Sequence, residues 1–345
     1  MSSPNASTAA PRTPASASAR RRGAEKYSKT VSEGLVPRAG RRYIHHVINS
    51  ASDEARGAAR TLGAAPAPDS ADPPKPTAPD AALDAPGCAA PTVPEDPGAE
   101  PPPAISVERL RVSRGRAPIL HDVSFSIRRG EIVGLLGPSG CGKTTLMRAL
   151  VGVQRIDAGT AAVLGCPAGS KRLRARIGYS TQQASAYPDL TVRRNALYFA
   201  ALAGAGRGAA DAAIRAVGLA DRAGQVVSTL SGGQASRASI ACALVGDPEV
   251  MVLDEPTVGL DPLTRESLWD VFRELARQGR TLLVSSHVMD EAMRCDRLIL
   301  MRRGRVLGVM TPAQLLEATG QDTPDRAFLA LVREDADDGA EGSVR

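Results

Sequence analysis

Residues 131–153 read EIVGLLGPSGCGKTTLMRALVGV, and this stretch decides the fold. Its first part, EIVGLL, has the short apolar composition of a buried strand, and its last part, TTLMRALVGV, has the apolar spacing of a helix. The seven residues between them, GPSGCGK, include three glycines. The order strand, glycine-rich loop, helix predicts one unit of an α/β fold with a parallel sheet.

The glycine-rich loop matches the phosphate-binding pattern GxxxxGK[ST] from Gly137 to Thr144. Glycines let successive backbone N–H groups point at phosphate oxygens, at the positive end of the following helix. We expect Lys143 to reach the β- and γ-phosphates and Thr144 to offer its hydroxyl to Mg²⁺. The alternative is a glycine-rich turn with a solvated lysine, and the flanking strand and helix argue against it. The predicted nucleotide-binding residues here are Gly137, Pro138, Ser139, Gly140, Cys141, Gly142, Lys143, Thr144 and Thr145.

Further strands surround this unit in the sequence. Residues 105–112 alternate as a strand should, and residues 119–127 form a second such run that ends at a turn. The apolar runs 250–254 and 281–286 flank a segment with helical apolar spacing, so they predict parallel strands that helices cover on both faces. Aromatic residues make up only 3% of the chain, which suits an α/β class with a core of Ala, Val, Leu and Ile.

The ends of the chain differ in composition from this core. Residues 1–104 are rich in Ala, Pro, Ser and Arg, and we interpret them as a disordered extension, in which one short helix is predicted from Tyr43 towards Ala59. Residues 105–332 form the predicted domain, and residues 333–345 are read as an acidic flexible tail. The net charge of +6 raises the question of an anionic partner, but arginine runs in the first sixty residues favour a solvated tail.

Cysteine usage and hydropathy restrict the compartment. Five cysteines at irregular spacing, without a CxxC pair, argue against a disulfide framework and a zinc site, and so favour a reducing compartment. No run of 18 or more apolar residues is present that could span a bilayer. Any membrane role therefore has to involve another subunit.

The segment Leu230–Gln234 reads LSGGQ. By itself it suggests only a turn and a helix start that Ser231 could cap. It lies about ninety residues after the phosphate loop, however, and in that order the chain resembles the ATP-binding subunits of ABC transporters over residues 105 to about 332. The resemblance implies a P-loop nucleotide-binding domain of ABC type, with a parallel-sheet core, an antiparallel β subdomain and a helical signature subdomain. It also implies nucleotide contacts from Ser231, Gly232, Gly233 and Gln234.

The resemblance assigns roles to other residues. Asp254 would hold Mg²⁺ through water, and Glu255 would polarise the attacking water. Gln182 would sense the metal and the γ-phosphate, although the neighbouring Gln183 leaves this assignment open by one residue. The implied metal contacts are Thr144, Gln182 and Asp254. His287 would act as the switch histidine. The predicted catalytic residues are thus Glu255, His287 and Gln182, with ATP and Mg²⁺ as the bound species.

Arg114 and Cys141 depart from the pattern of the family. Family members usually carry an adenine-stacking aromatic residue where this chain has Arg114, whose guanidinium can also stack on a base. Cys141 lies beside Lys143 and a helix N-terminus, where its thiol could have a lowered pKa and be sensitive to oxidation.

The resemblance implies an ATPase that dimerises around ATP and drives a separate multi-span permease at the cytoplasmic face of the membrane. Single-domain organisation and the segments 187–192 and 311–316 resemble exporters of drugs, lipids or polysaccharides. Two alternatives remain: a soluble ABC ATPase acting on nucleic acid or the ribosome, and an ATP-gated binding module. The chain shows neither a long coiled-coil insertion nor a second such domain, which speaks against the first, so nucleic acid is not the expected partner.

Overall fold

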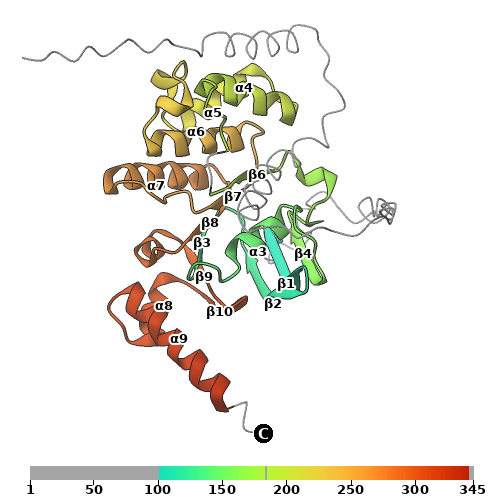
Figure 1. Cartoon of the computed structure of the whole chain (residues 1–345), viewed down its shortest axis with the longest axis vertical. Helices are drawn as coiled ribbons and strands as arrows, with labels where there is room; N and C mark the ends of the chain where they lie inside the picture. The colour runs from blue at the N-terminus through green and yellow to red at the C-terminus, as the bar shows by residue number, and fades with distance from the viewer. Residues whose placement is uncertain (1–100, 183–184, 342–345) are drawn as a thin grey trace, which may run out of the picture. The chain divides into compact units, whose positions relative to one another are not determined.

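The computed structural model describes residues 101–182 and 185–341 (Figure 1). The predicted helix near Tyr43 and nearly all of the predicted extension over residues 1–104 therefore lie outside the described residues. Strand β1 starts at Ile105, where the alternating pattern begins.

A six-stranded sheet forms the centre of the fold, in the order β10-β9-β3-β8-β7-β6. Its strands are β3 (Ile132–Leu136), β6 (Ile177–Ser180), β7 (Val250–Asp254), β8 (Thr281–Ser286), β9 (Arg297–Arg302) and β10 (Arg305–Met310). The first five are parallel, and β10 pairs with β9 in the antiparallel direction at the edge. Every residue of β3, β7 and β8 is buried, as apolar strands covered on both faces should be. The predicted parallel sheet is confirmed.

A second sheet is antiparallel, in the order β2-β1-β4-β5. Its strands are β1 (Ile105–Arg114), β2 (Ala117–Ile127), β4 (Ala158–Val163) and β5 (Cys166–Pro167). Helix α3 (Lys143–Leu150) shares one core with both sheets. Leu146, Met147 and Leu150 of this helix are fully buried in that core, so the element that carries the phosphate loop is held rigidly.

Helices α4, α5 and α6 group together beyond β6 in Figure 1. They are α4 (Val192–Ala203), α5 (Arg207–Ala216) and α6 (Gly232–Leu244), and α6 also contacts β6 and α7 (Pro262–Arg277). The helical spacing predicted for the segment between β7 and β8 is confirmed in α7, where Leu268, Phe272 and Leu275 are buried. Gly279 follows its end with a φ of 87°, as a helix-terminating glycine does.

The last helices are α8 (Pro312–Thr319) and α9 (Pro324–Glu341). The acidic tail is expected to begin at residue 333, and this position falls inside α9. The helix continues there because no proline follows its apolar first half. No helix among the residues described is both long and apolar enough to cross a membrane.

The cysteines depart from expectation at one position. In the described part of the chain, Cys141, Cys242 and Cys295 are free and buried, whereas Cys166 on β5 is disulfide-bonded. The argument against a disulfide framework did not anticipate this single bond, because sequence spacing does not limit which cysteines meet in space.

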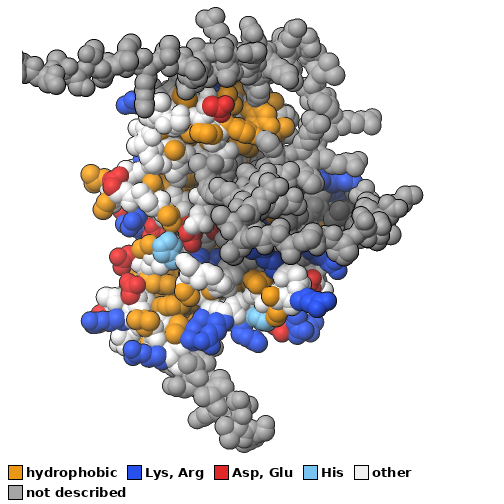
Figure 2. All heavy atoms as spheres, viewed as in Figure 1, with side chains coloured by type: hydrophobic (Ala, Val, Ile, Leu, Met, Phe, Trp, Pro, Cys, Tyr) orange, Lys and Arg blue, Asp and Glu red, His pale blue; other side chains and the backbone are white. Residues whose placement is uncertain are grey.

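Charges of both signs are interspersed on the face drawn in Figure 2. Many basic side chains there and elsewhere are paired: Arg111 lies 2.6 Å from Asp122, and Arg193 lies 3.0 Å from Asp211.

Candidate functional site

The phosphate loop connects the end of β3 to the start of α3 at Lys143. Two of its glycines are required by the backbone. A Cβ at Gly137 would lie 2.2 Å from the carbonyl oxygen of Met301, and Gly142 has a φ of 112°, which side-chain-bearing residues rarely adopt. The loop is therefore pressed against β9, and its geometry depends on glycine at these two positions.

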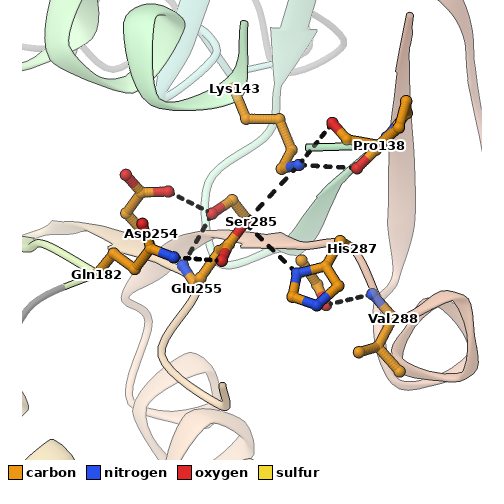
Figure 3. A network of polar contacts seen from close by, with 10 residues as sticks. Pro138, Lys143, Gln182, Asp254, Glu255, Ser285, His287 and Val288 are labelled. Carbon is orange, nitrogen blue, oxygen red and sulfur yellow. Dashed lines mark hydrogen bonds and ion pairs between the residues drawn. The ribbon is translucent and has the colours of Figure 1, made fainter. Parts of the chain in front are cut away.

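Lys143 lies where this loop meets α3, and its side chain is only 5% exposed. Its Nζ donates to the carbonyl oxygens of Gly137, at 2.7 Å, and Pro138, at 3.2 Å (Figure 3). Its nearest described carboxylate oxygen is Oε1 of Glu255, at 3.9 Å. A buried ammonium that is held mainly by neutral carbonyl groups is a favourable place for an anion such as a phosphate.

Two adjacent acids lie near this lysine: Asp254 is the last residue of β7, and Glu255 follows it. Asp254 is 2% exposed, and its Oδ1 accepts a hydrogen bond from the Ser285 hydroxyl at 2.7 Å. The same hydroxyl accepts from the backbone N–H of Glu255 at 2.9 Å. Glu255 has a φ of 48°, a left-handed conformation that non-glycine residues rarely adopt and that clusters at functional sites. Ser285 thus fixes both acids relative to β8.

The carboxylate of Glu255 gathers three of the predicted site residues. Gln182 Nε2 donates to its Oε2 at 2.8 Å, and His287 Nδ1 lies 3.5 Å from its Oε1, the oxygen that also faces Lys143 (Figure 3). These residues come from the ends of four different strands: β3, β6, β7 and β8. Carboxyl ends of parallel strands meet at one edge of a sheet, which is where α/β folds place ligands.

The residues present fit a magnesium ion held together with a nucleotide. Thr144 is half-buried in the first turn of α3, and Asp254 supplies a carboxylate; both offer the hard oxygens that Mg²⁺ prefers. Over residues 101–182 and 185–341, no cluster of three or more His, Cys, Asp or Glu side chains could hold a metal by itself. Mg²⁺ in nucleotide sites commonly takes few protein ligands and completes its shell with phosphates and water.

The signature segment forms the start of α6. The Ser231 hydroxyl accepts from the backbone N–H of Gln234, and the Gln234 side chain accepts from the backbone N–H of Ser231, which makes a capping box. A Cβ at Gly233 would lie 2.0 Å from Thr264 Cγ2, so α6 packs closely on the start of α7. In the described residues, the network around Glu255 includes none of Ser231, Gly232, Gly233 or Gln234.

Arg114 ends β1 and is exposed beside the turn to β2. Cys141 is buried, and its burial raises the pKa of the thiol, although Lys143 acts in the opposite direction. The prediction of a lowered thiol pKa is therefore wrong, because desolvation outweighs the nearby positive charge.

Ser285 is the functional residue that the sequence interpretation missed. Its signal was present: it is the first of two serines that follow the apolar residues of β8, two positions before His287. Only the parallel pairing of β7 with β8, which sets Asp254 beside Ser285, shows its role.

Residues 120–258 match the ABC transporter family. A Nod factor export ATP-binding protein I from Ralstonia nicotianae is 38% identical over 258 residues, which cover 70% of this chain and 80% of that protein. This chain belongs to the ABC transporter ATP-binding proteins. A protein of the same name from Burkholderia orbicola is 41% identical over 207 residues, 58% of this chain and 68% of that protein.

Solved structures agree with this family and its fold. The ATP-binding subunit of an ABC transporter is 25% identical, with a TM-score of 0.60, over 66% of this chain and 99% of its own. A bacterial Atm1-family ABC exporter with ATP bound is 26% identical, with a TM-score of 0.58, over 68% of this chain and 42% of its own. ABC transporter ATP-binding proteins are ATPases, so the chain is an ATP-binding ATPase with the predicted P-loop fold. The protein cbiO1 of Clostridium perfringens, which is part of an ABC transporter complex, is 25% identical, with a TM-score of 0.57, over 66% of this chain and 98% of its own.

Proposed function

We propose that this chain is the ATPase of an exporter, and that two copies close around ATP to drive a separate multi-span permease from the cytoplasmic face of the membrane. The names of the relatives from Ralstonia and Burkholderia, which specify export, support the direction of transport. We place the cargo among drugs, lipids and polysaccharides, because the single-domain organisation and the segments 187–192 and 311–316 resemble exporters of that kind.

The observation that carries this function is the meeting of Lys143, Gln182 and His287 around the Glu255 carboxylate. ATP hydrolysis by phosphate-loop enzymes depends on positioning and charge neutralisation. Bound Mg²⁺ would supply further neutralisation of the phosphates through Thr144 and Asp254. The arrangement therefore offers the Lys143 ammonium to bind phosphate and the oxygens of Thr144 and Asp254 to bind a metal. The Glu255 carboxylate is placed to orient a water molecule.

Each side chain then has a defined task. Lys143 exchanges the carbonyl oxygens of Gly137 and Pro138 for phosphate oxygens. Glu255 accepts a hydrogen bond from the attacking water and orients it in line with the γ-phosphate. His287 and Gln182 lie on either side of that carboxylate, where they hold it in place and sense the nucleotide.

A second copy completes the site in this proposal. The signature residues Ser231–Gln234 present a helix N-terminus, and among the described contacts of one copy they take no part in the network around Glu255. Helix N-termini bind phosphate well. We infer that the signature of one copy covers the nucleotide held by Lys143 of the other.

The test is to isolate the tagged full-length chain from its native cells, once from detergent-solubilised membranes and once from the soluble fraction. We expect a multi-span membrane protein in equal amount with the chain, and ATPase activity that changes when that protein's cargo is added. Recovery of the chain only with ribosomes or nucleic acid would contradict the transport function.

A further inference from the structure

An ion pair behind the site joins helix α7 to the 3₁₀ segment η6 (Met289–Arg294), which follows β8. Arg265 Nε lies 3.7 Å from Glu291 Oε1, and the Glu291 side chain is 2% exposed. In the described part of the chain, the two carboxylate oxygens of Glu291 have no hydrogen-bond partner. The same is true there of Arg265 Nε. Burying a carboxylate that is paired with only one guanidinium costs desolvation free energy. Replacing such a pair with apolar residues of similar volume often leaves the stability of a protein unchanged or higher.

The pair connects the two backbone segments that leave the site. On one side, Arg265 Nη2 donates to the carbonyl oxygen of Leu260 at 3.4 Å. Leu260 ends the loop that starts at Glu255, in which Val258 N donates to Glu255 O and Leu260 N donates to Thr257 O. The guanidinium therefore contacts the loop that sets the backbone position of Glu255.

On the other side, Glu291 lies one turn after His287. Its backbone N–H donates to Val288 O at 3.2 Å, and Val288 N donates to Ser286 Oγ at 3.0 Å (Figure 3). Glu291 O also accepts a hydrogen bond from Cys295 Sγ. The carboxylate is thus held in the compact turn that directs the backbone at His287.

We propose that Arg265 and Glu291 are a positioning pair, which keeps the loop after Glu255 in register with the turn after His287, and so keeps the imidazole against the catalytic carboxylate. The proposal rests on the function proposed for Glu255 and His287. Among the described contacts, neither Arg265 nor Glu291 meets the side chains of Glu255 and His287, so each acts through the segment it holds.

A second pair between the same two elements provides a matched control. Glu266 of α7 pairs with Arg294 of η6, and Glu266 also lies 3.5 Å from Arg273. These side chains are 48%, 29% and 41% exposed, and neither Glu266 nor Arg294 contacts the loop from Glu255 to Leu260 in the described residues. Glu266→Gln therefore weakens the α7–η6 contact without touching the positioning pair.

The main variant is the double substitution Arg265→Met with Glu291→Leu. It removes both charges together, so that no unpaired charge stays buried and the fold is kept. We expect a melting temperature close to that of the unmodified protein and a dissociation constant for Mg–ATP within about threefold. We expect kcat to fall at least about tenfold, since small displacements of catalytic groups reduce rates on this scale. Glu266→Gln should leave kcat unchanged.

A folded double variant with unmodified kcat would show that the pair is structural only. If the double variant is unstable, Arg265→Lys decides: it keeps the charge beside Glu291 but loses the fork that reaches Leu260. It should lower kcat several-fold at unchanged ATP affinity, and an unmodified kcat would overturn the proposal. Glu255→Gln in the same assay separates the two hypotheses, because an active Glu255→Gln protein would overturn the proposed function itself.

Discussion

Ser285 shows how one hydroxyl can organise two acids. It donates to the Asp254 carboxylate and accepts from the Glu255 backbone, so it sets the last residue of β7 and the strained residue after it against β8. A hydrogen bond to a charged group contributes about 1.5–3 kcal/mol, and its loss leaves Asp254 free to move.

Ser285→Ala should therefore lower ATP turnover by about tenfold or more, because about 1.4 kcal/mol of transition-state free energy corresponds to tenfold in rate. Thr281→Val is the matched control: it removes a hydroxyl that accepts from Gly130 N at the far end of the same strand. We expect that variant to lose some stability and no turnover. Steady-state phosphate release for both variants, compared with their melting temperatures, checks this. Equal turnover losses in the two variants would contradict the role of Ser285.

Lys143 tests binding rather than turnover. Its ammonium is buried and contacts carbonyl groups that a phosphate can replace. Lys143→Ala should weaken Mg–ATP binding by about ten- to a hundredfold, on the scale of one lost charge-assisted hydrogen bond. Titration calorimetry measures this, with Lys171→Ala, outside the site, as the control. Unchanged affinity in the Lys143 variant would mean that the phosphates bind elsewhere.

At the scale of elements, Glu249 holds the strand starts together at the edge opposite the site. It precedes β7 and accepts from Arg176 Nε at 2.5 Å and from Arg129 Nη1 at 3.1 Å. These two hydrogen bonds lower the pKa of Glu249 below its usual 4.5, and the bond from Arg176 has the larger effect. A depressed folded-state pKa stabilises the protein above the unfolded pKa, and this contribution is lost as the pH falls through the folded value.

Glu249→Gln should thus be less stable than the unmodified protein at pH 7, and the difference should shrink as the pH falls from 4.5 through the folded pKa. Urea unfolding of both proteins across this range measures the difference in the free energy of unfolding. A deficit that stays constant down to pH 3 would contradict the depressed pKa.

The elements with strong local signals were the ones that could be predicted. Continuous apolar runs gave β7 and β8 with their observed bounds, and the glycine pattern placed the phosphate loop between β3 and α3. The antiparallel direction of β10 and the contacts of Ser285 and Arg265 could not be predicted, because each depends on residues far apart in sequence. The thiol of Cys141 was misjudged because its burial is a tertiary property.

At the scale of the whole molecule, the proposed mechanism needs two copies of the chain. Within one copy, the network around Glu255 and the signature residues Ser231–Gln234 share no described contact. In the proposed mechanism, the signature of a second copy supplies that contact through the bound nucleotide. ATP hydrolysis should therefore rise more than linearly with protein concentration where monomers predominate. Phosphate release measured over a dilution series, alongside the mass from light scattering, checks this. Linear activity from a demonstrated monomer would contradict the shared site.

The most direct test of the account is phosphate release by the Glu255→Gln protein under saturating Mg–ATP. The amide keeps the shape of the side chain but cannot act as a base, while Lys143, Thr144 and Asp254 are unchanged. We expect that ATP still binds and that hydrolysis falls by about two orders of magnitude or more, the scale for loss of a positioned base. Hydrolysis near the unmodified rate would contradict the assignment of the catalytic carboxylate, and failure to bind ATP would show that Glu255 is structural.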